Sequence, residues 1–208
     1  VPDLSIGIGG YGAFFDSFCT IAEKLFLIDD TRDAYLLRHT INFLIYFLGA
    51  YSFFVFSKKL FRSYYIGFIA SLFYLLNPRL LAHGFFNGKD SIAQALVACS
   101  LFPLLMTFKN RDIKWPIISG LIIGVAITTR IPIIYLPLLF LILIFSYYYN
   151  SQKLNSHINK FTIITFIVTT IISVYSFWPL LWTSPLSSFK KIFLNMSNHQ
   201  WEGSNYYL

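Results

Sequence analysis

Long apolar stretches separated by short polar connections dominate the chain. A helix needs about 20 apolar residues to cross a bilayer, and its backbone groups must be hydrogen-bonded within the segment. None of the stretches alternates with the period of two that a barrel strand shows. The pattern therefore predicts an all-α fold, a polytopic transmembrane helical bundle of about six spans. The apolar stretches cover residues 40–57, 60–77, 91–107, 116–129, 131–149 and 161–182. Gly120 and Gly124 predict tight packing of the shortest one against a neighbour.

Composition excludes a water-soluble domain. Hydrophobic residues make up 56% of the 208 residues, charged residues only 12%, and the mean hydropathy is +0.63. A soluble domain carries about 25% charged residues. The two cysteines provide no disulfide framework. Because the sequence starts at Val1 and stops at Leu208 in an aromatic run, we expect it to be part of a longer protein.

Basic residues gather in alternate connections and predict the orientation. They are Lys58, Lys59 and Arg62, then Lys109, Arg111 and Lys114, then Lys153 and Lys160. By the positive-inside rule these connections are cytoplasmic. The predicted single membrane domain, 1–208, then comprises an outer loop at 1–39, a transmembrane bundle at 40–182 and an outer tail at 183–208. Residues 12–28 are amphipathic and predict a helix lying in the outer interface.

The segment 77–90, which we expect to be a loop between two spans, concentrates polar side chains. Ionisable groups at membrane depth are costly, so such a cluster favours a functional site. Its members are Arg79, His83, Asn87, Lys89 and Asp90. The competing interpretation is that Arg79 and Lys89 reach lipid headgroups and Asp90 caps the next helix. In the predicted topology Arg38, Arg79, Lys89 and Arg130 reach one interface, where four cations can hold a phosphate or diphosphate.

Two other motifs have ordinary explanations. Residues 7–12 match G-x-G-x-x-G, but nothing supplies the parallel sheet that dinucleotide binding requires. The acidic stretch 29–33 reads as a solvated helix start capped by Thr31.

Several segments together resemble the bacterial polyprenyl-phosphate-dependent glycosyltransferases of glycosyltransferase family 39. This group is related to the protein O-mannosyltransferases and the lipid A aminoarabinose transferase, and it has the GT-C fold. The resemblance covers about residues 30–203 in order. Its motifs are Tyr35-Leu36-Leu37-Arg38-His39, Asn77-Pro78-Arg79, Ala82-His83-Gly84-Phe85-Phe86-Asn87-Gly88-Lys89-Asp90, Gly120 to Arg130, Phe177 to Trp182 with Pro185, and Met196-Ser197-Asn198-His199 with Trp201. Asn77 and Gly88 depart from the family's Ser and Pro, and the family's catalytic acid is expected upstream of Val1.

The resemblance implies transfer of a sugar from a polyprenyl-phosphate carrier to a protein, lipid or glycan acceptor on the outer face of the cell membrane. Asp90 and His83 are the implied catalytic residues. The implied substrate-binding residues are Arg38, Arg79, Asn87, Lys89 and Arg130. The resemblance leaves a divalent metal open, with Asp90 and His83 as its ligands. The partners are the donor, the acceptor and the lipid bilayer, and not nucleic acid. A transporter or flippase of a lipid-linked anion is the main alternative, and a purely structural membrane subunit is another.

Overall fold

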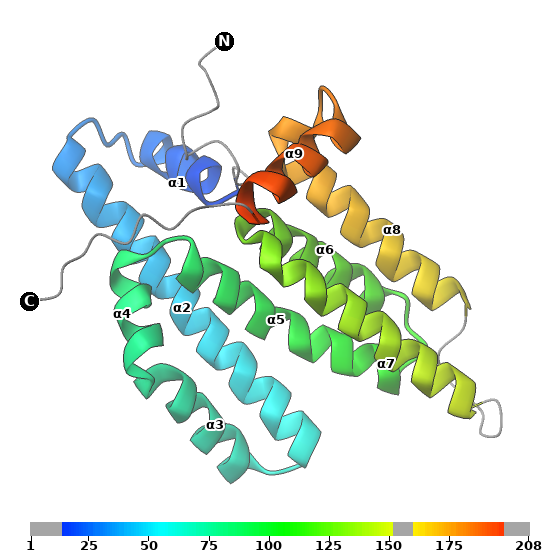
Figure 1. Cartoon of the computed structure of the whole chain (residues 1–208). Helices are drawn as coiled ribbons and strands as arrows, with labels where there is room; N and C mark the ends of the chain where they lie inside the picture. The colour runs from blue at the N-terminus through cyan, green and yellow to red at the C-terminus, as the bar shows by residue number, and fades with distance from the viewer. Residues whose placement is uncertain (1–13, 152–159, 198–208) are drawn as a thin grey trace, which may run out of the picture.

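The computed structural model describes residues 14–151 and 160–197, which fold as helices joined by short turns (Figure 1). No strand occurs within these two ranges, so the predicted all-α class is confirmed. The glycine motif at 7–12, the connection at 152–159 and the motif residues from 198 onward lie outside the described residues. The helices are α1 Phe14–Leu25, α2 Thr31–Phe61, α3 Tyr64–Leu76, α4 Pro78–Phe86, α5 Asp90–Lys109, α6 Lys114–Thr129, η1 Ile131–Ile134, α7 Tyr135–Ser151, α8 Lys160–Phe177, η2 Pro179–Leu181 and α9 Pro185–Ser197.

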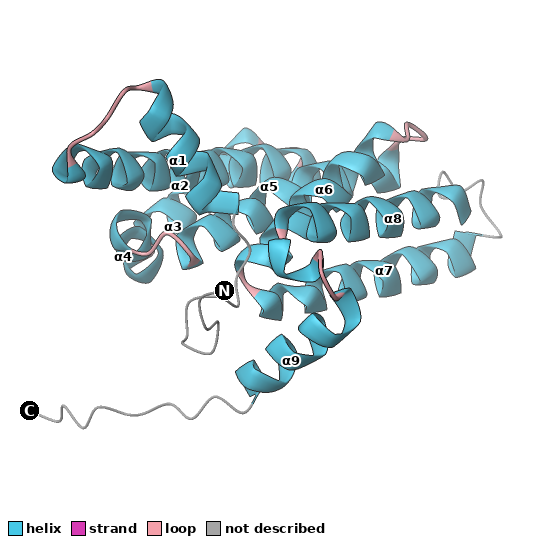
Figure 2. Ribbon diagram, turned by 90° about the horizontal axis from the view of Figure 1, so that it is seen from above, coloured by secondary structure: helices cyan, strands magenta, loops and turns pink. Residues whose placement is uncertain are grey.

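The long helices lie side by side, with α5 between α2 and α6 (Figures 1 and 2). Helix α3 packs against α2, and α8 packs against α6. The largest apolar core joins α5, α6, α7 and α8, where Ile123 is fully buried and the rings of Phe140 and Phe166 lie 5.9 Å apart.

Two glycines bring α6 and α8 into close contact. A Cβ at Gly120 would overlap Thr169 Oγ1, and a Cβ at Gly124 would overlap Ser173 Cβ. The Ser173 hydroxyl donates a hydrogen bond of 2.8 Å to the carbonyl of Leu121 across the same contact. Small residues at a helix interface permit this approach. The predicted tight packing is confirmed, and the neighbour is α8.

Each of the six predicted apolar stretches forms a helix, but they differ in length. Helices α2, α5 and α8 are long and apolar enough to cross a membrane. Helices α3 and α4 would form a fourth span if the pair, bent by 62°, is counted as one. Helix α6 and the helix that follows it are apolar but shorter. Length and hydropathy therefore support three or four spans, fewer than the six predicted.

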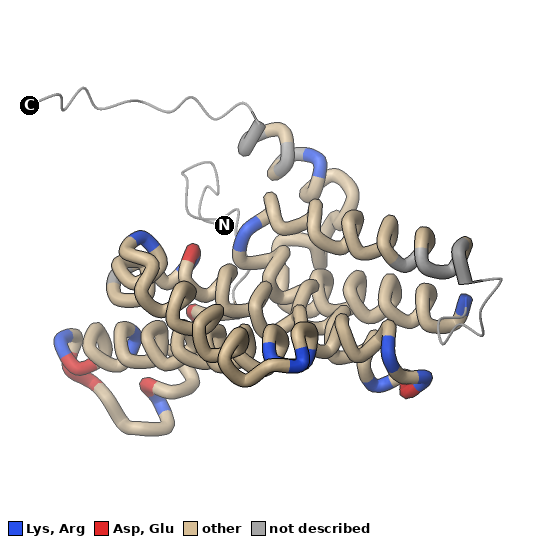
Figure 3. The backbone as a smooth tube through the Cα atoms, turned by 90° about the horizontal axis from the view of Figure 1, so that it is seen from below, with Lys and Arg blue, Asp and Glu red and all other residues tan. Residues whose placement is uncertain are grey.

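Charged residues lie at the two ends of the bundle (Figure 3). Within the described part of the chain, Asp112 is the one acid at the end where α5 is joined to α6. The remaining described acids belong to α1, the start of α2 and the start of α5. The described parts of the predicted outer and cytoplasmic connections thus lie at opposite ends of the bundle.

Helix boundaries follow local capping. Asp30, and not Thr31 as predicted, caps α2, because its side chain accepts a hydrogen bond of 3.2 Å from the Arg32 N–H. Asn77 ends α3 and caps α4, accepting from the N–H groups of Arg79 and Leu80 at 3.1 and 3.2 Å. Pro78 at the first position of α4 has no N–H to satisfy.

Candidate functional site

The ends of three helices place four polar side chains together at the end of the bundle where α5 begins. Asp90 begins α5 and forms an ion pair with Arg130, which directly follows α6. Its other carboxylate oxygen accepts a hydrogen bond of 2.7 Å from the Asn87 side chain. The Nδ1 atom of His83, near the end of α4, lies 4.0 Å from the same oxygen. We call His83, Asn87, Asp90 and Arg130 the Asp90 cluster.

The segment before Asp90 is a helix followed by a tight turn, and the predicted loop at 78–90 is therefore wrong. Asn77 and Pro78 start α4 in the manner described above, and α4 continues to Phe86. Asn87 then accepts hydrogen bonds from the N–H groups of Lys89 and Asp90, at 3.2 and 3.1 Å, through its side-chain oxygen. Asn87 rather than Asp90 thus satisfies the backbone at the start of α5. The carboxylate of Asp90 is directed to side chains instead.

The sequence after Arg130 determines that α6 ends just before this residue. Its backbone is extended, with φ −144° and ψ 110°, because Ile131-Pro132 cannot continue α6. The side chain is 33% exposed and that of Asp90 is 36% exposed, so the ion pair is partly desolvated. A guanidinium has five N–H donors in a planar fork, which allows it to contact a carboxylate and a phosphate together.

A buried set of hydrogen bonds centred on Asn42, which the sequence did not predict, supports the cluster. Asn42 on α2 is 2% exposed and donates hydrogen bonds to the carbonyls of Gly84 and His83, at 2.9 and 3.3 Å. Its side-chain oxygen accepts a hydrogen bond of 2.6 Å from Ser91. Asn42 therefore ties α2, α4 and α5 together. The sequence feature that could have indicated it is the amide of Asn42 inside an apolar stretch, because an amide without hydrogen-bond partners is costly in a membrane.

The other predicted cations do not join the cluster in the same way. Arg79 is exposed at the start of α4, and Lys89 is exposed in the turn before α5. Arg38 lies on α2 and forms ion pairs with two acids of α1, Glu23 and Asp16. The predicted convergence of four cations is therefore wrong for Arg38, whose guanidinium is directed to α1.

The cluster does not fit a metal ion in this arrangement. One Asp90 oxygen is paired with Arg130 and the other accepts from Asn87, so a cation would have to displace both donors. No group of three or more His, Cys, Asp or Glu side chains suited to a metal gathers anywhere in residues 14–151 and 160–197. We therefore derive no step through a metal.

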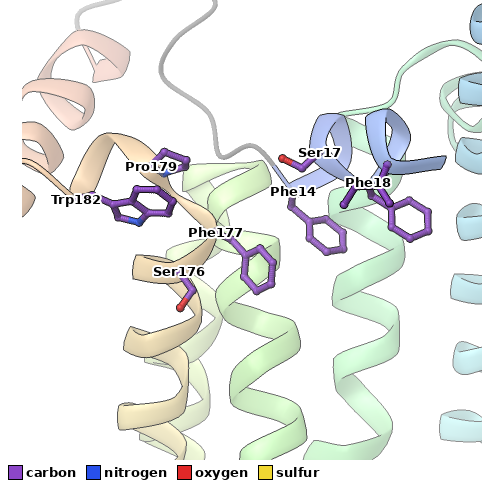
Figure 4. A pocket seen from close by; sticks show the side chains of 8 residues that line it. Phe14, Ser17, Phe18, Ser176, Phe177, Pro179 and Trp182 are labelled. Carbon is purple, nitrogen blue, oxygen red and sulfur yellow. The ribbon is translucent and has the colours of Figure 1, made fainter. Parts of the chain in front are cut away.

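An apolar groove of about 240 Å³ lies between α1 and the end of α8 (Figure 4). Phe14 on α1 meets Phe177 on α8 edge to face, with ring centroids 5.4 Å apart. Trp182 closes the far side and donates a hydrogen bond of 2.7 Å to the Tyr175 carbonyl. The groove can accommodate a short length of an aliphatic chain. Its lining comprises Phe14, Ser17, Phe18, Ile21, Ser176, Phe177, Pro179 and Trp182.

The fold and the cluster define an α-helical integral membrane protein with a charged polar site at one end of its bundle. The chain belongs to the dolichyl-phosphate-mannose-protein mannosyltransferase family, whose model matches residues 21–178. Membership places it among the membrane glycosyltransferases that take their sugar from a polyprenyl-phosphate donor, and it confirms the predicted family. Searches of curated proteins and of solved structures gave no significant match.

Proposed function

We propose that the chain is part of a multi-pass enzyme of the cell membrane that transfers a hexose, with mannose the first candidate, to an acceptor on the outer face. The observation that carries the proposal is the pairing of Asp90 with Arg130 and Asn87 in a chain of this family. Membership of a glycosyltransferase family favours an enzyme over the transporter, flippase or structural subunit considered from the sequence.

The proposed reaction is an inverting displacement at the anomeric carbon of the sugar. The acceptor oxygen attacks this carbon, and the bond from the carbon to the phosphate oxygen breaks, with its electron pair going to the phosphate. Asp90 accepts a hydrogen bond from the acceptor hydroxyl and orients it, because a carboxylate with two partners still has lone pairs to offer, and the hydroxyl proton goes to the family's catalytic carboxylate. His83 orients the acceptor beside it.

Cations stabilise the charge that develops on the departing phosphate. Arg130 is the central candidate, because its guanidinium has five N–H donors and can contact a phosphate as well as Asp90. Lys89 adjoins Asp90 in sequence, and Arg79 is one helical turn before His83 on α4, so both can approach the same phosphate. The apolar groove beside α1 offers the polyprenyl chain a surface next to this end of the bundle.

The test is sugar transfer by the full-length protein in nanodiscs, with polyprenyl-phosphate-mannose as donor. We expect Asp90→Asn to leave a folded protein and to lower turnover by about 100-fold or more, because the acceptor loses the carboxylate that orients it. The matched control is Asp112→Asn, which removes an exposed carboxylate paired with Lys114 at the other end of the bundle. Equal turnover in the two variants would contradict the role of Asp90.

A further inference from the structure

Helix α1 is attached to the bundle through one stripe of side chains. Phe15, Cys19 and Glu23 are spaced four residues apart and therefore share a face. Cys19 is fully buried and the Glu23 side chain is 17% exposed. Away from this stripe, Phe18 and Leu25 are 49% and 76% exposed. Helix α1 lies against α2 and α6 at the end of the bundle where α2 begins (Figure 1).

One end of the stripe is held by an ion pair with α2. Arg38 Nε lies 2.6 Å from Glu23 Oε1, and Arg38 Nη2 lies 3.4 Å from Glu23 Oε2, so the carboxylate is held by two nitrogens. Asp16 adds a longer contact of 3.5 Å from a side chain that is 72% exposed. Two parallel hydrogen bonds fix the direction of a carboxylate as well as its distance. Arg38 thus sets where this end of α1 lies.

The other end of the stripe touches the turn that carries the Asp90 cluster. A Cβ added to Gly88 would lie 2.8 Å from Phe15 Cε1 and 3.3 Å from Phe15 Cδ1. The Phe15 ring therefore rests directly on the backbone between Asn87 and Asp90. This is the turn in which Asn87 holds both the start of α5 and the Asp90 carboxylate.

We propose that Arg38 and Glu23 are positioning residues, whose ion pair docks α1 so that Phe15 holds the 87–90 turn in its reactive geometry. The proposal rests on the proposed function for its effect on turnover. Neither residue contacts the reacting atoms. A displacement of about 1 Å in a reacting group can cost about 100-fold in rate, so a helix that loosens above the turn is expected to slow transfer. The effect reaches Asp90 through Phe15 and Gly88.

Charge reversal tests the ion pair, and Cys19 reports the docking. The parent is full-length protein that carries Asp16→Asn and Cys99→Ala. The first substitution removes the other acid that pairs with Arg38. The second removes the other cysteine of the described residues, so that labelling there reports Cys19. The variants are Arg38→Glu, Glu23→Arg and the double exchange, and Arg32→Glu is the control on the exposed first turn of α2. Burial raises the pKa of the Cys19 thiol to about 11, which together with its lack of exposure protects it from maleimide at neutral pH.

Each single reversal is expected to expose Cys19 to maleimide and to lower kcat by about 10- to 100-fold, with the donor KM within about twofold of the parent value. The double exchange is expected to restore both Cys19 protection and kcat. Arg32→Glu is expected to change neither measurement.

Three results would overturn the proposal. Protected Cys19 in Arg38→Glu would show that the ion pair does not dock α1. Exposed Cys19 with unchanged kcat would show that docking does not position the turn. A double exchange that restores protection but leaves a raised donor KM would assign Arg38 to the donor phosphate. If the parent transfers no sugar, the proposed function fails, and the labelling of Cys19 alone decides whether the ion pair docks α1.

Discussion

Among single residues, Asn42 joins three helices at the candidate site. It is nearly inaccessible, and its amide joins the carbonyls of His83 and Gly84 to the hydroxyl of Ser91. Inside an apolar bundle these groups cannot bond to water instead. Removing the amide therefore costs the desolvation penalty of its partners in addition to the lost hydrogen bonds. It determines how far α4 lies from α2 and α5.

Replacing Asn42 with Leu keeps the number and branching of the side-chain heavy atoms and removes the amide. Three polar groups then lose a partner, and we expect the stability of the protein to fall by about 1–3 kcal/mol. The measurement is the thermal midpoint in detergent. Thr40→Val is the control, because the exposed Thr40 hydroxyl bonds only to the Leu36 carbonyl of its own helix. Equal midpoints for the two variants would show that the hydrogen bonds centred on Asn42 contribute nothing.

The sequence predicted which polar residues form the site more successfully than it predicted which residues each of them contacts. His83, Asn87, Asp90 and Arg130 were selected because ionisable and amide groups are costly at membrane depth, and the structure brings these four together. Arg38 was assigned to the same group from its predicted depth and from the family resemblance of residues 35–39. The predicted depth of a cation in the membrane does not show which acid it pairs with. Arg38 pairs with Glu23 on α1, and no local sequence pattern predicts where α1 packs.

At the scale of elements, apolar stretches predicted the existence of helices but not their ends. Helix α2 begins at Thr31, about nine residues before its apolar run, because Asp30 caps it there. Helix α4 was predicted as a loop, since nine mixed residues have no long apolar period. The missed signal was Asn77-Pro78, which is a favourable pair of first residues for a new helix as well as a stop for the previous one.

The contact between α6 and α8 depends on the absence of side chains at Gly120 and Gly124. We expect Gly124→Leu to force the two helices apart at Ser173 and to lower stability by about 1–3 kcal/mol or more, the usual cost of overpacking. The thermal midpoint in detergent measures the effect. Ile118→Phe is the control, since this side chain is 39% exposed on the same helix. A midpoint in Gly124→Leu as high as in the control would contradict the close contact.

At the scale of the whole molecule, the distribution of charge relates the fold to the membrane. The Asp90 cluster, α1 and the start of α2 share one end of the bundle. Lys58, Lys59, Lys109 and Lys114 lie at the other end. Basic residues are retained on the cytoplasmic side during insertion, whereas acids have little influence. Arg38, Arg79, Lys89 and Arg130 lie at the cluster's own end, so the prediction that the cluster faces outward rests on the gathering of lysines in the short connections at the other end and on the proposed acceptor.

Labelling of single cysteines in intact cells tests this orientation. The probes are Thr31→Cys at the start of α2 and Arg111→Cys between α5 and α6, both exposed, in full-length protein without other cysteines. Because the two positions lie at opposite ends of the bundle, a membrane-impermeant maleimide can reach only one of them. We expect Thr31→Cys to be labelled in intact cells and Arg111→Cys to be labelled only after permeabilisation. The reverse result would place Asp90 and Arg130 on the cytoplasmic side, and the proposed transfer to an outer acceptor would then be wrong.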